Sequence, residues 1–158
     1  MSFIFYSCAT KPVVVVDLTQ WYNSVKISEY DDSTEYFSFI GSNLSGKHFA
    51  LMNFDKKHEK LVVTFALNEG DFDYQNNETI KVRFDNGHEK EYRVHNSSAP
   101  NLIHIFEDRK FAEKLSRSEN LKVKLRIKDH GVKTFSWKKV EGLPEVYYKN
   151  LPQEPIKI

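Results

Sequence analysis

One stretch of the chain alternates strictly between apolar and cationic residues: Leu121-Lys122-Val123-Lys124-Leu125-Arg126-Ile127-Lys128. Successive side chains of a β-strand point to opposite faces, so this pattern predicts a strand with one buried face and one cationic face. The turn Asp129-His130-Gly131 then leads into Val132 to Val140, which we expect to return as the partner strand of a hairpin. The alternation therefore indicates an antiparallel sheet.

A second hairpin is predicted upstream, where Thr79 to Phe84 alternates between apolar and polar residues. The turn Asp85-Asn86-Gly87 follows, and Asn-Gly between alternating runs is a strong hairpin signal because both residues tolerate positive φ. The return strand is Glu89 to Val94. Other strands are predicted where Phe, Val, Ile or Leu gather between turn residues: Val13 to Asp17, Glu35 to Ile40, His48 to Phe54, Lys60 to Leu67 and Asn101 to Phe106.

Two short helices are expected among these strands. Asp108 can cap the first, over 108–117, in which three apolar residues recur at helical spacing: Phe111, Ala112 and Leu115. The second is predicted over 143–151, with Pro144 in its first turn. We therefore expect a mainly β protein, an antiparallel β-sandwich or barrel with two short helices. Residues 13–151 form a single β-rich domain in this prediction, and 152–158 form a C-terminal tail.

The only cysteine, Cys8, follows the apolar run Phe3 to Ser7 and precedes a polar turn. A small residue directly before a cysteine is typical of a bacterial lipoprotein signal, which predicts that 1–12 is a signal remnant or tether and Cys8 a lipid attachment site. A secretory signal has a basic start and about 7–15 apolar residues, however, and only Met1 to Ser7 precede the cysteine. The alternative is a short first strand with a buried thiol that packs like a small hydrophobe.

Composition narrows the classes of protein that fit this chain. Its 158 residues suit one domain, and it has no apolar stretch of about 18 residues that would span a membrane. A single cysteine excludes an internal disulfide framework and a cysteine-based zinc site. The net charge of +1 gives no global attraction to nucleic acid.

Charge is unevenly distributed along the chain, with −4 over residues 1–75 and +5 over residues 76–158. The acidic part gathers at four residues: Glu29, Asp31, Asp32 and Glu35. The basic part gathers between Lys122 and Lys139. Such asymmetry marks either opposed faces for partners or two solvated surfaces that attract each other weakly.

No motif in the sequence predicts catalysis. The six histidines are scattered singly, without the helical i, i+4 pair of a zinc protease or a tight ligand cluster. The loop from Gly41 to Lys47 has the glycine spacing of a phosphate loop, but His48 stands where a Ser or Thr must bind magnesium. A Gly-x-Ser-x-Gly elbow is absent as well. We therefore predict no enzyme, no catalytic residue, no metal site and no cofactor.

The order of core positions resembles that of two related families of bacterial envelope proteins. The residues that carry the likeness span residues 20–151 and are Trp21, Val82-Arg83-Phe84, Phe111, Leu115, Leu121, Val123, Leu125, Phe135 and Gly142-Leu143. The chain is similar here to the invasion-associated locus B-like proteins and to the VasI-like proteins associated with type VI secretion. Those families often place cysteines inside the domain, which this chain does not. The resemblance implies a small exported β-domain with an accessory, non-enzymatic role, and it implies no site.

The cationic face of the alternating strand is the strongest candidate for a function. Burying unpaired cations is prohibitive, so Lys122, Lys124, Arg126 and Lys128 must face water or an anionic partner, and Arg83 lies on another predicted hairpin with Lys81. A protein partner or an anionic membrane surface fits a tethered domain, and nucleic acid ranks below both, with Trp137 as a ring on which a base could stack. The alternative is an edge strand protected from aggregation by lysine.

Two functional classes follow from these residues. The first is a non-enzymatic, lipid-anchored accessory or protein-binding domain of the cell envelope. The second is a cytoplasmic β-barrel module that binds an anionic partner such as nucleic acid, or inhibits a partner protein.

Overall fold

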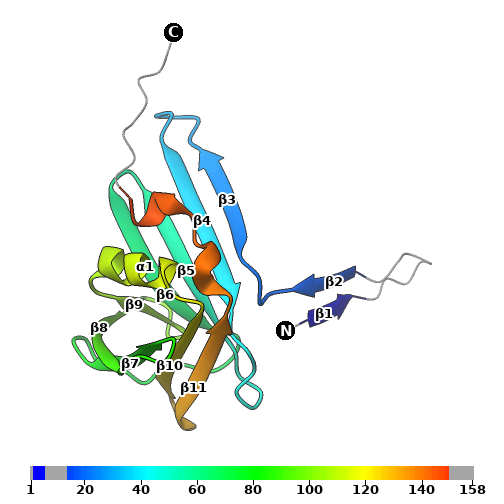
Figure 1. Ribbon diagram of the computed structural model, residues 1–158, viewed down its shortest axis with the longest axis vertical. Helices are drawn as coiled ribbons and strands as arrows, with labels where there is room; N and C mark the ends of the chain where they lie inside the picture. The colour runs from blue at the N-terminus through cyan, green and yellow to red at the C-terminus, as the bar shows by residue number, and fades with distance from the viewer. Residues whose placement is uncertain (1, 6–13, 150–158) are drawn as a thin grey trace.

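Nine strands form one antiparallel sheet in the computed structural model, which describes residues 2–5 and 14–149 (Figure 1). In sheet order these are β11 (Gly131–Lys138), β10 (Asn120–Ile127), β7 (Thr79–Phe84), β8 (Lys90–Asn96), β9 (Leu102–Ile105), β6 (Lys60–Leu67), β5 (Ala50–Lys57), β4 (Thr34–Gly41) and β3 (Tyr22–Ile27). Both predicted hairpins are confirmed, since β7 pairs with β8 and β10 pairs with β11. The mainly β, antiparallel fold class is also confirmed.

The sheet curls until its two ends approach each other, which gives a sandwich-like shape. The amide of Asn43, just after β4, donates to the carbonyl of Ser136 on β11 at 2.8 Å, and the Trp137 indole donates to the carbonyl of Ile40 at 3.0 Å. Within the described residues, the sheet order ends at β11 on one side and at β3 on the other. The sheet is therefore not a closed barrel.

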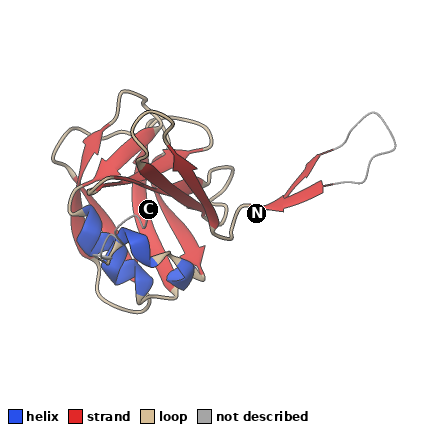
Figure 2. Cartoon of the chain, turned by 90° about the horizontal axis from the view of Figure 1, so that it is seen from above, coloured by secondary structure: helices blue, strands red, loops and turns tan. Residues whose placement is uncertain are grey.

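The core fills the concave side of this curled sheet. Helix α1 (Asp108–Ser116) lies there and buries its apolar face, namely Phe111, Ala112 and Leu115. The ring of Phe111 packs against aromatic side chains from three strands, Phe54, Phe65 and Phe84. Figure 2 shows the helical segments gathered on one side of the curled sheet. The opposite, convex face of the strands is left for solvent or partners.

Strand β3 was not predicted from the sequence, because Tyr22 to Ile27 lacks a clear alternation of apolar and polar residues. It forms an edge of the sheet and pairs only with β4. Most of its side chains are exposed, so the sequence shows no regular row of apolar residues that would mark a buried face.

The predicted second helix is wrong in extent. Within the described part of 143–151 only a short 3-10 helix forms, η2 (Glu145–Tyr147), and a second one, η1 (Val140–Gly142), precedes the predicted range. The residue before a proline is disfavoured in the helical region, and Leu143 accordingly adopts φ −61° and ψ 125° before Pro144. Pro144 is extended as well, so these two residues separate η1 from η2.

The first helix is confirmed, but its cap differs from the prediction. Glu107, in the left-handed conformation with φ 61°, precedes the helix and makes no side-chain capping hydrogen bond. Asp108 lies inside the first turn, and its Oδ1 is buried without a hydrogen-bond partner. Burial raises the pKa of Asp108 to about 6, against the effect of a hydrogen bond with the Val63 backbone.

A separate two-stranded sheet precedes the nine strands. It consists of β1 (Ser2–Phe5) and β2 (Val14–Asp17), which pair antiparallel and project away from the main body (Figures 1 and 2). The strand alternative for the segment before the cysteine is thus seen over Ser2–Phe5. Cys8 lies outside the described residues, as does the C-terminal tail over 152–158.

Candidate anionic-partner interface

Strand β10 has the two faces that its sequence predicts. Four alternate residues are buried, with exposed fractions of 1% or less: Leu121, Val123, Leu125 and Ile127. The intervening Lys122 and Lys124 are exposed on the convex face of the sheet. Alternation thus fixes the orientation of both lysines, because a shift by one residue would bury them.

The register between β10 and β7 brings four cations together. Lys122 lies directly opposite Arg83, and Lys124 lies directly opposite Lys81. Like charges in directly opposite cross-strand positions destabilise a sheet, whereas ordinary sheets favour opposite charges there. This surface, formed by Lys81, Arg83, Lys122 and Lys124, is the cationic face.

Two carboxylates partly compensate this charge, and the first is Glu89 in the segment before β8. Its Oε1 lies 2.7 Å from the Lys124 ammonium and 3.9 Å from an Arg83 guanidinium nitrogen. The hydrogen bond from Lys124 holds the pKa of Glu89 below its usual range, so the carboxylate stays charged. Glu91 on β8 lies directly opposite Lys81 and adds a second negative charge to this face. Two negative charges against four positive charges leave the cationic face with a net excess of about two.

The cationic face lines a shallow groove made of two neighbouring depressions. The first, of about 220 Å³, is lined by the four cations together with Glu89 and Thr134. The second, of about 540 Å³, shares Arg83, Lys122 and Thr134 with the first and extends toward Leu44 and Lys138. Leu44 is 59% exposed and adds an apolar contact to a rim that is otherwise polar. We call this surface the cationic groove.

Asp85, an acidic residue that lines the second depression, has structural partners. Asp85 Oδ1 accepts hydrogen bonds from the amides of Glu119 and Asn120, both at 2.9 Å. These bonds join the β7–β8 turn to the start of β10 and so help to fix the register of the cationic face. Asp85 therefore has a structural role, and its charge faces backbone donors.

Arg126 does not lie on the open cationic face as predicted. Its side chain is half-buried, and one guanidinium nitrogen donates to both carboxylate oxygens of Glu78, at 2.8 and 2.9 Å. The Nε atom of Arg126 donates to the carbonyl of Asp73 at 2.8 Å, and the guanidinium group lies over the Tyr74 ring. The hydrogen bond to Glu78 raises the pKa of Arg126, so the guanidinium stays charged, and the Glu78 carboxylate balances that charge within the chain. Lys128 is exposed but lies beyond β10, outside the two depressions.

Trp137 is also placed differently from the prediction. Its side chain is only 1% exposed and packs against Phe65 and Phe135 in the core. A ring that is buried in this way cannot stack on a base. Among the residues that line the two depressions it is the only aromatic side chain.

Four of the six histidines, scattered in sequence, form two contacting pairs. His95 and His104 lie opposite each other on β8 and β9 with ring centroids 5.1 Å apart, and His104 Nδ1 is 2.8 Å from the Thr64 hydroxyl. His48 is buried with its Nδ1 unpartnered, and its ring lies 5.0 Å from that of His130. No group of three or more metal-binding side chains occurs among the described residues.

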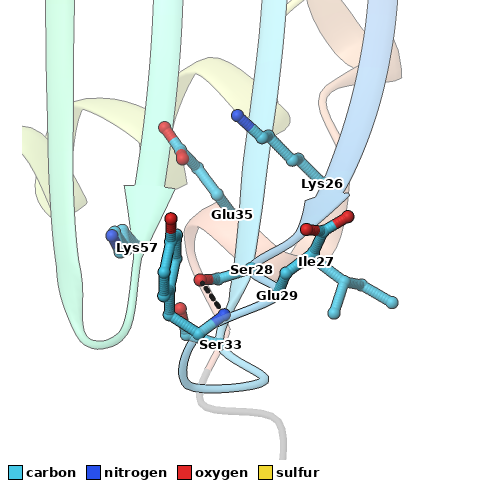
Figure 3. A pocket seen from close by; sticks show the side chains of 8 residues that line it. Lys26, Ile27, Ser28, Glu29, Ser33, Glu35 and Lys57 are labelled. Atoms are coloured by element: carbon cyan, nitrogen blue, oxygen red, sulfur yellow. Dashed lines mark hydrogen bonds between the residues drawn. The ribbon is translucent and has the colours of Figure 1, made fainter.

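A third depression lies at the turn between β3 and β4, with a volume of about 350 Å³ (Figure 3). Its lining mixes two acidic and two basic residues, Glu29, Glu35, Lys26 and Lys57, with small polar groups. Tyr30 also lines it, and the Tyr30 amide donates to the Ser28 hydroxyl at 3.2 Å. The sequence had marked this turn only through its acidic residues.

Several residues of the interface could not be found from the sequence. The apposition of Lys81 with Lys124 depends on pairing between β7 and β10, which lie about forty residues apart and carry no local signal for each other. Leu44 and Thr134 join the groove for the same reason. Glu89 follows a predicted hairpin turn, but the hairpin alone does not show that it reaches Lys124.

These observations define a β-sandwich-like domain with a cationic groove on the convex face of its sheet. Comparison with protein-family models, with curated proteins and with solved structures finds no match for this chain. The likeness to the two envelope families therefore stays a prediction. No helix within the described residues is long and apolar enough to cross a membrane.

Proposed function

We propose that this chain is a non-enzymatic binding domain that docks an anionic partner protein in its cationic groove. The observation that carries the proposal is the pair of like-charged cross-strand contacts, Lys122 with Arg83 and Lys124 with Lys81. Like charges directly opposite each other destabilise a sheet, whereas opposite charges there stabilise it by about 0.2–1 kcal/mol. Glu89 and Glu91 offset only part of the charge of the four cations, and the remaining excess favours a role in binding.

The residues that line the groove favour an anionic ligand. They also favour a protein as the molecule that carries the anionic groups. Ammonium and guanidinium groups bind carboxylates, and the hydroxyl of Thr134 adds a hydrogen-bonding group beside them. The exposed side chain of Leu44, at the rim of the groove, offers an apolar contact to a protein partner. Nucleic acid fits the groove less well, because Trp137, the one aromatic residue among those that line the groove, is buried.

The test measures binding of a fluorescent glutamate-rich peptide to the full chain by anisotropy at low salt. Lys122→Glu with Lys124→Glu should weaken binding by about tenfold or more, and added salt should weaken binding to the wild type. The matched control, Lys60→Glu with Arg109→Glu, makes the same change in net charge at two exposed positions outside the groove. Its affinity should stay close to that of the wild type.

Two further probes distinguish the source of the anion. An oligonucleotide and vesicles of anionic lipid should bind more weakly than the peptide at equal charge concentration. Equal losses of peptide binding in the groove variant and in the control would refute the proposal. Tighter binding to vesicles or to the oligonucleotide would refute the choice of a protein partner.

The predicted location in the cell envelope and the lipid attachment at Cys8 belong to the same proposal and rest on the sequence. The native gene should direct the chain to the membrane fraction, and Cys8→Ala should release it with the domain still folded. Recovery of the wild-type chain in the soluble fraction would refute the anchor and leave the groove proposal intact.

A further inference from the structure

The turn between β3 and β4 carries a dense negative charge. Three of the six residues from Ser28 to Ser33 are acidic and exposed, namely Glu29, Asp31 and Asp32, and none of the six is basic. Tyr30 stands between them and is completely exposed, with a relative accessibility of 101%. We call these four residues the acidic tip. An exposed aromatic ring flanked by carboxylates is suited to a cationic protein surface that also offers an apolar contact.

Hydrogen bonds hold the acidic tip in one conformation. The amide of Ser28 donates to the Ser33 carbonyl at 2.8 Å, and Asp31 Oδ1 accepts from the amide and the hydroxyl of Ser33 at 3.0 and 2.6 Å. The bonds from Ser33 lower the pKa of Asp31 to about 2, so its charge persists through the physiological range. A preorganised turn loses little conformational entropy when it docks.

The acidic tip and the cationic groove lie at opposite ends of the molecule. Figure 1 shows the β3–β4 turn at the top of the view and strands β7, β10 and β11 at the bottom. A tip at one end of a rigid sheet cannot reach the groove at the other end of the same copy. Contact between these two surfaces is therefore between molecules.

We propose that the acidic tip of one copy of this chain docks in the cationic groove of a second copy. The inference rests on the proposed function, because it names the anionic partner of the same groove. Three carboxylates meet a net excess of about two positive charges, and the Tyr30 ring is the apolar counterpart of the exposed Leu44. The near-zero net charge of +1 adds little long-range repulsion between copies.

The predicted contact is heterologous, since two different surfaces meet. Such contacts leave one tip and one groove free in every dimer, so they generate rings or open chains of molecules. Because exposed ion pairs dominate the contact, association should be strong at low salt and lost at high salt.

Sedimentation velocity of the full chain at low and high salt tests this arrangement. We expect larger species at low salt and a monomer at high salt. Two charge reversals should each give a monomer at low salt: Lys122→Glu with Lys124→Glu in the groove, and Glu29→Lys with Asp32→Lys in the tip. Lysine is tolerated at the left-handed backbone of Asp32, since Lys139 adopts a similar φ of 57° elsewhere in the chain.

Mixing the two variants gives the sharpest result. The groove variant has an acidic tip and an acidic groove, while the tip variant has a basic tip and a basic groove. Neither should associate with itself, but each tip complements the groove of the other, so the mixture should form the large species again. The control Glu113→Lys with Glu141→Lys reverses two exposed acidic residues away from the tip and should associate like the wild type.

The outcomes separate this inference from the proposed function. A wild type that stays monomeric at low salt while its groove binds the glutamate-rich peptide would overturn the self-docking and leave the proposed function standing. Failure of both measurements would overturn both. Association that persists in the tip variant, or a mixture that stays monomeric, would also overturn the self-docking.

Discussion

Lys122 on β10 lies directly opposite Arg83 on β7, so two cations occupy one cross-strand position on the convex face of the sheet. This arrangement predicts a conflict between stability and binding. Lys122→Glu should replace a repulsive pair by an attractive one and raise the free energy of unfolding by about 0.5 kcal/mol. Urea denaturation measures this change.

The same substitution should weaken binding of an acidic partner, as expected where function opposes stability. Lys139→Glu, at an exposed position outside the groove and outside the strand register, serves as control and should leave the unfolding free energy nearly unchanged, since Glu107 adopts a similar φ elsewhere in the chain. A Lys122→Glu protein less stable than this control would show that the like-charged contact does not strain the sheet.

A carboxylate on the buried face of β10 should have the opposite effect on stability from one on the cationic face. Val123 is completely buried, so Val123→Asp should place an unpaired carboxylate in the core and unfold the domain at room temperature. Thr134→Asp adds the same carboxylate on the convex face, opposite Lys124, and should be neutral or stabilising. Circular dichroism with thermal melting distinguishes the two variants, and a folded Val123→Asp protein would contradict this orientation of β10.

His48 predicts a loss of stability in mild acid. Burial lowers its pKa from the ordinary value of 6.5, with a further contribution from the neighbouring His130 and from Lys47 and Lys133, while Glu69 acts against them. A pKa lower in the folded state means that the unfolded chain binds the proton more readily. Stability is therefore fully present above about pH 6.5 and falls as the pH drops below that value.

The variant His48→Leu should flatten this part of the pH dependence. The exposed His88 provides a control, and His88→Gln should keep the wild-type slope. His104, whose pKa burial also lowers, supplies part of the slope that remains. Urea denaturation midpoints measured between pH 7 and pH 5 test this prediction. The same change of midpoint with pH in the wild type and in His48→Leu would contradict the assignment of the acid sensitivity to His48.

Asp108 predicts a pH dependence of stability opposite in sign to that of His48. Its pKa is raised to about 6 from 3.8, so the folded state disfavours the charged carboxylate. The cost is absent when both states are protonated, below about pH 3.8, and is fully present above about pH 6. Asp108→Asn should therefore raise the melting temperature at pH 7 and lose this advantage near pH 4. A lower melting temperature at pH 7 would show that the charge of Asp108 stabilises α1.

Local sequence patterns predicted most of the fold because they report on burial within one element. The alternation from Leu121 to Lys128 placed every side chain of β10 on its correct face except for the partial burial of Arg126. The Asn-Gly turn after Asp85 likewise marked the β7–β8 hairpin. An exposed edge strand such as β3 has no buried stripe, so the same method could not find it.

The candidate site was predictable only in part, because its geometry depends on contacts between distant segments. The lysines of β10 were visible in the sequence, but their apposition with Arg83 and Lys81 required the register between β10 and β7. Arg126 differs from its neighbours because Glu78, which is remote in sequence, lies beside it in the fold. Trp137 was assigned to the surface, although the inward curl of the sheet buries it.

Nuclear magnetic resonance of the full chain, titrated with the glutamate-rich peptide, tests the central claim most directly. Amide shift changes should gather at Lys81, Arg83, Lys122, Lys124 and Thr134 and should fade as salt is added. Changes that gather instead on α1 or along β3, or the absence of changes at low salt, would contradict an anionic-partner interface at the cationic groove.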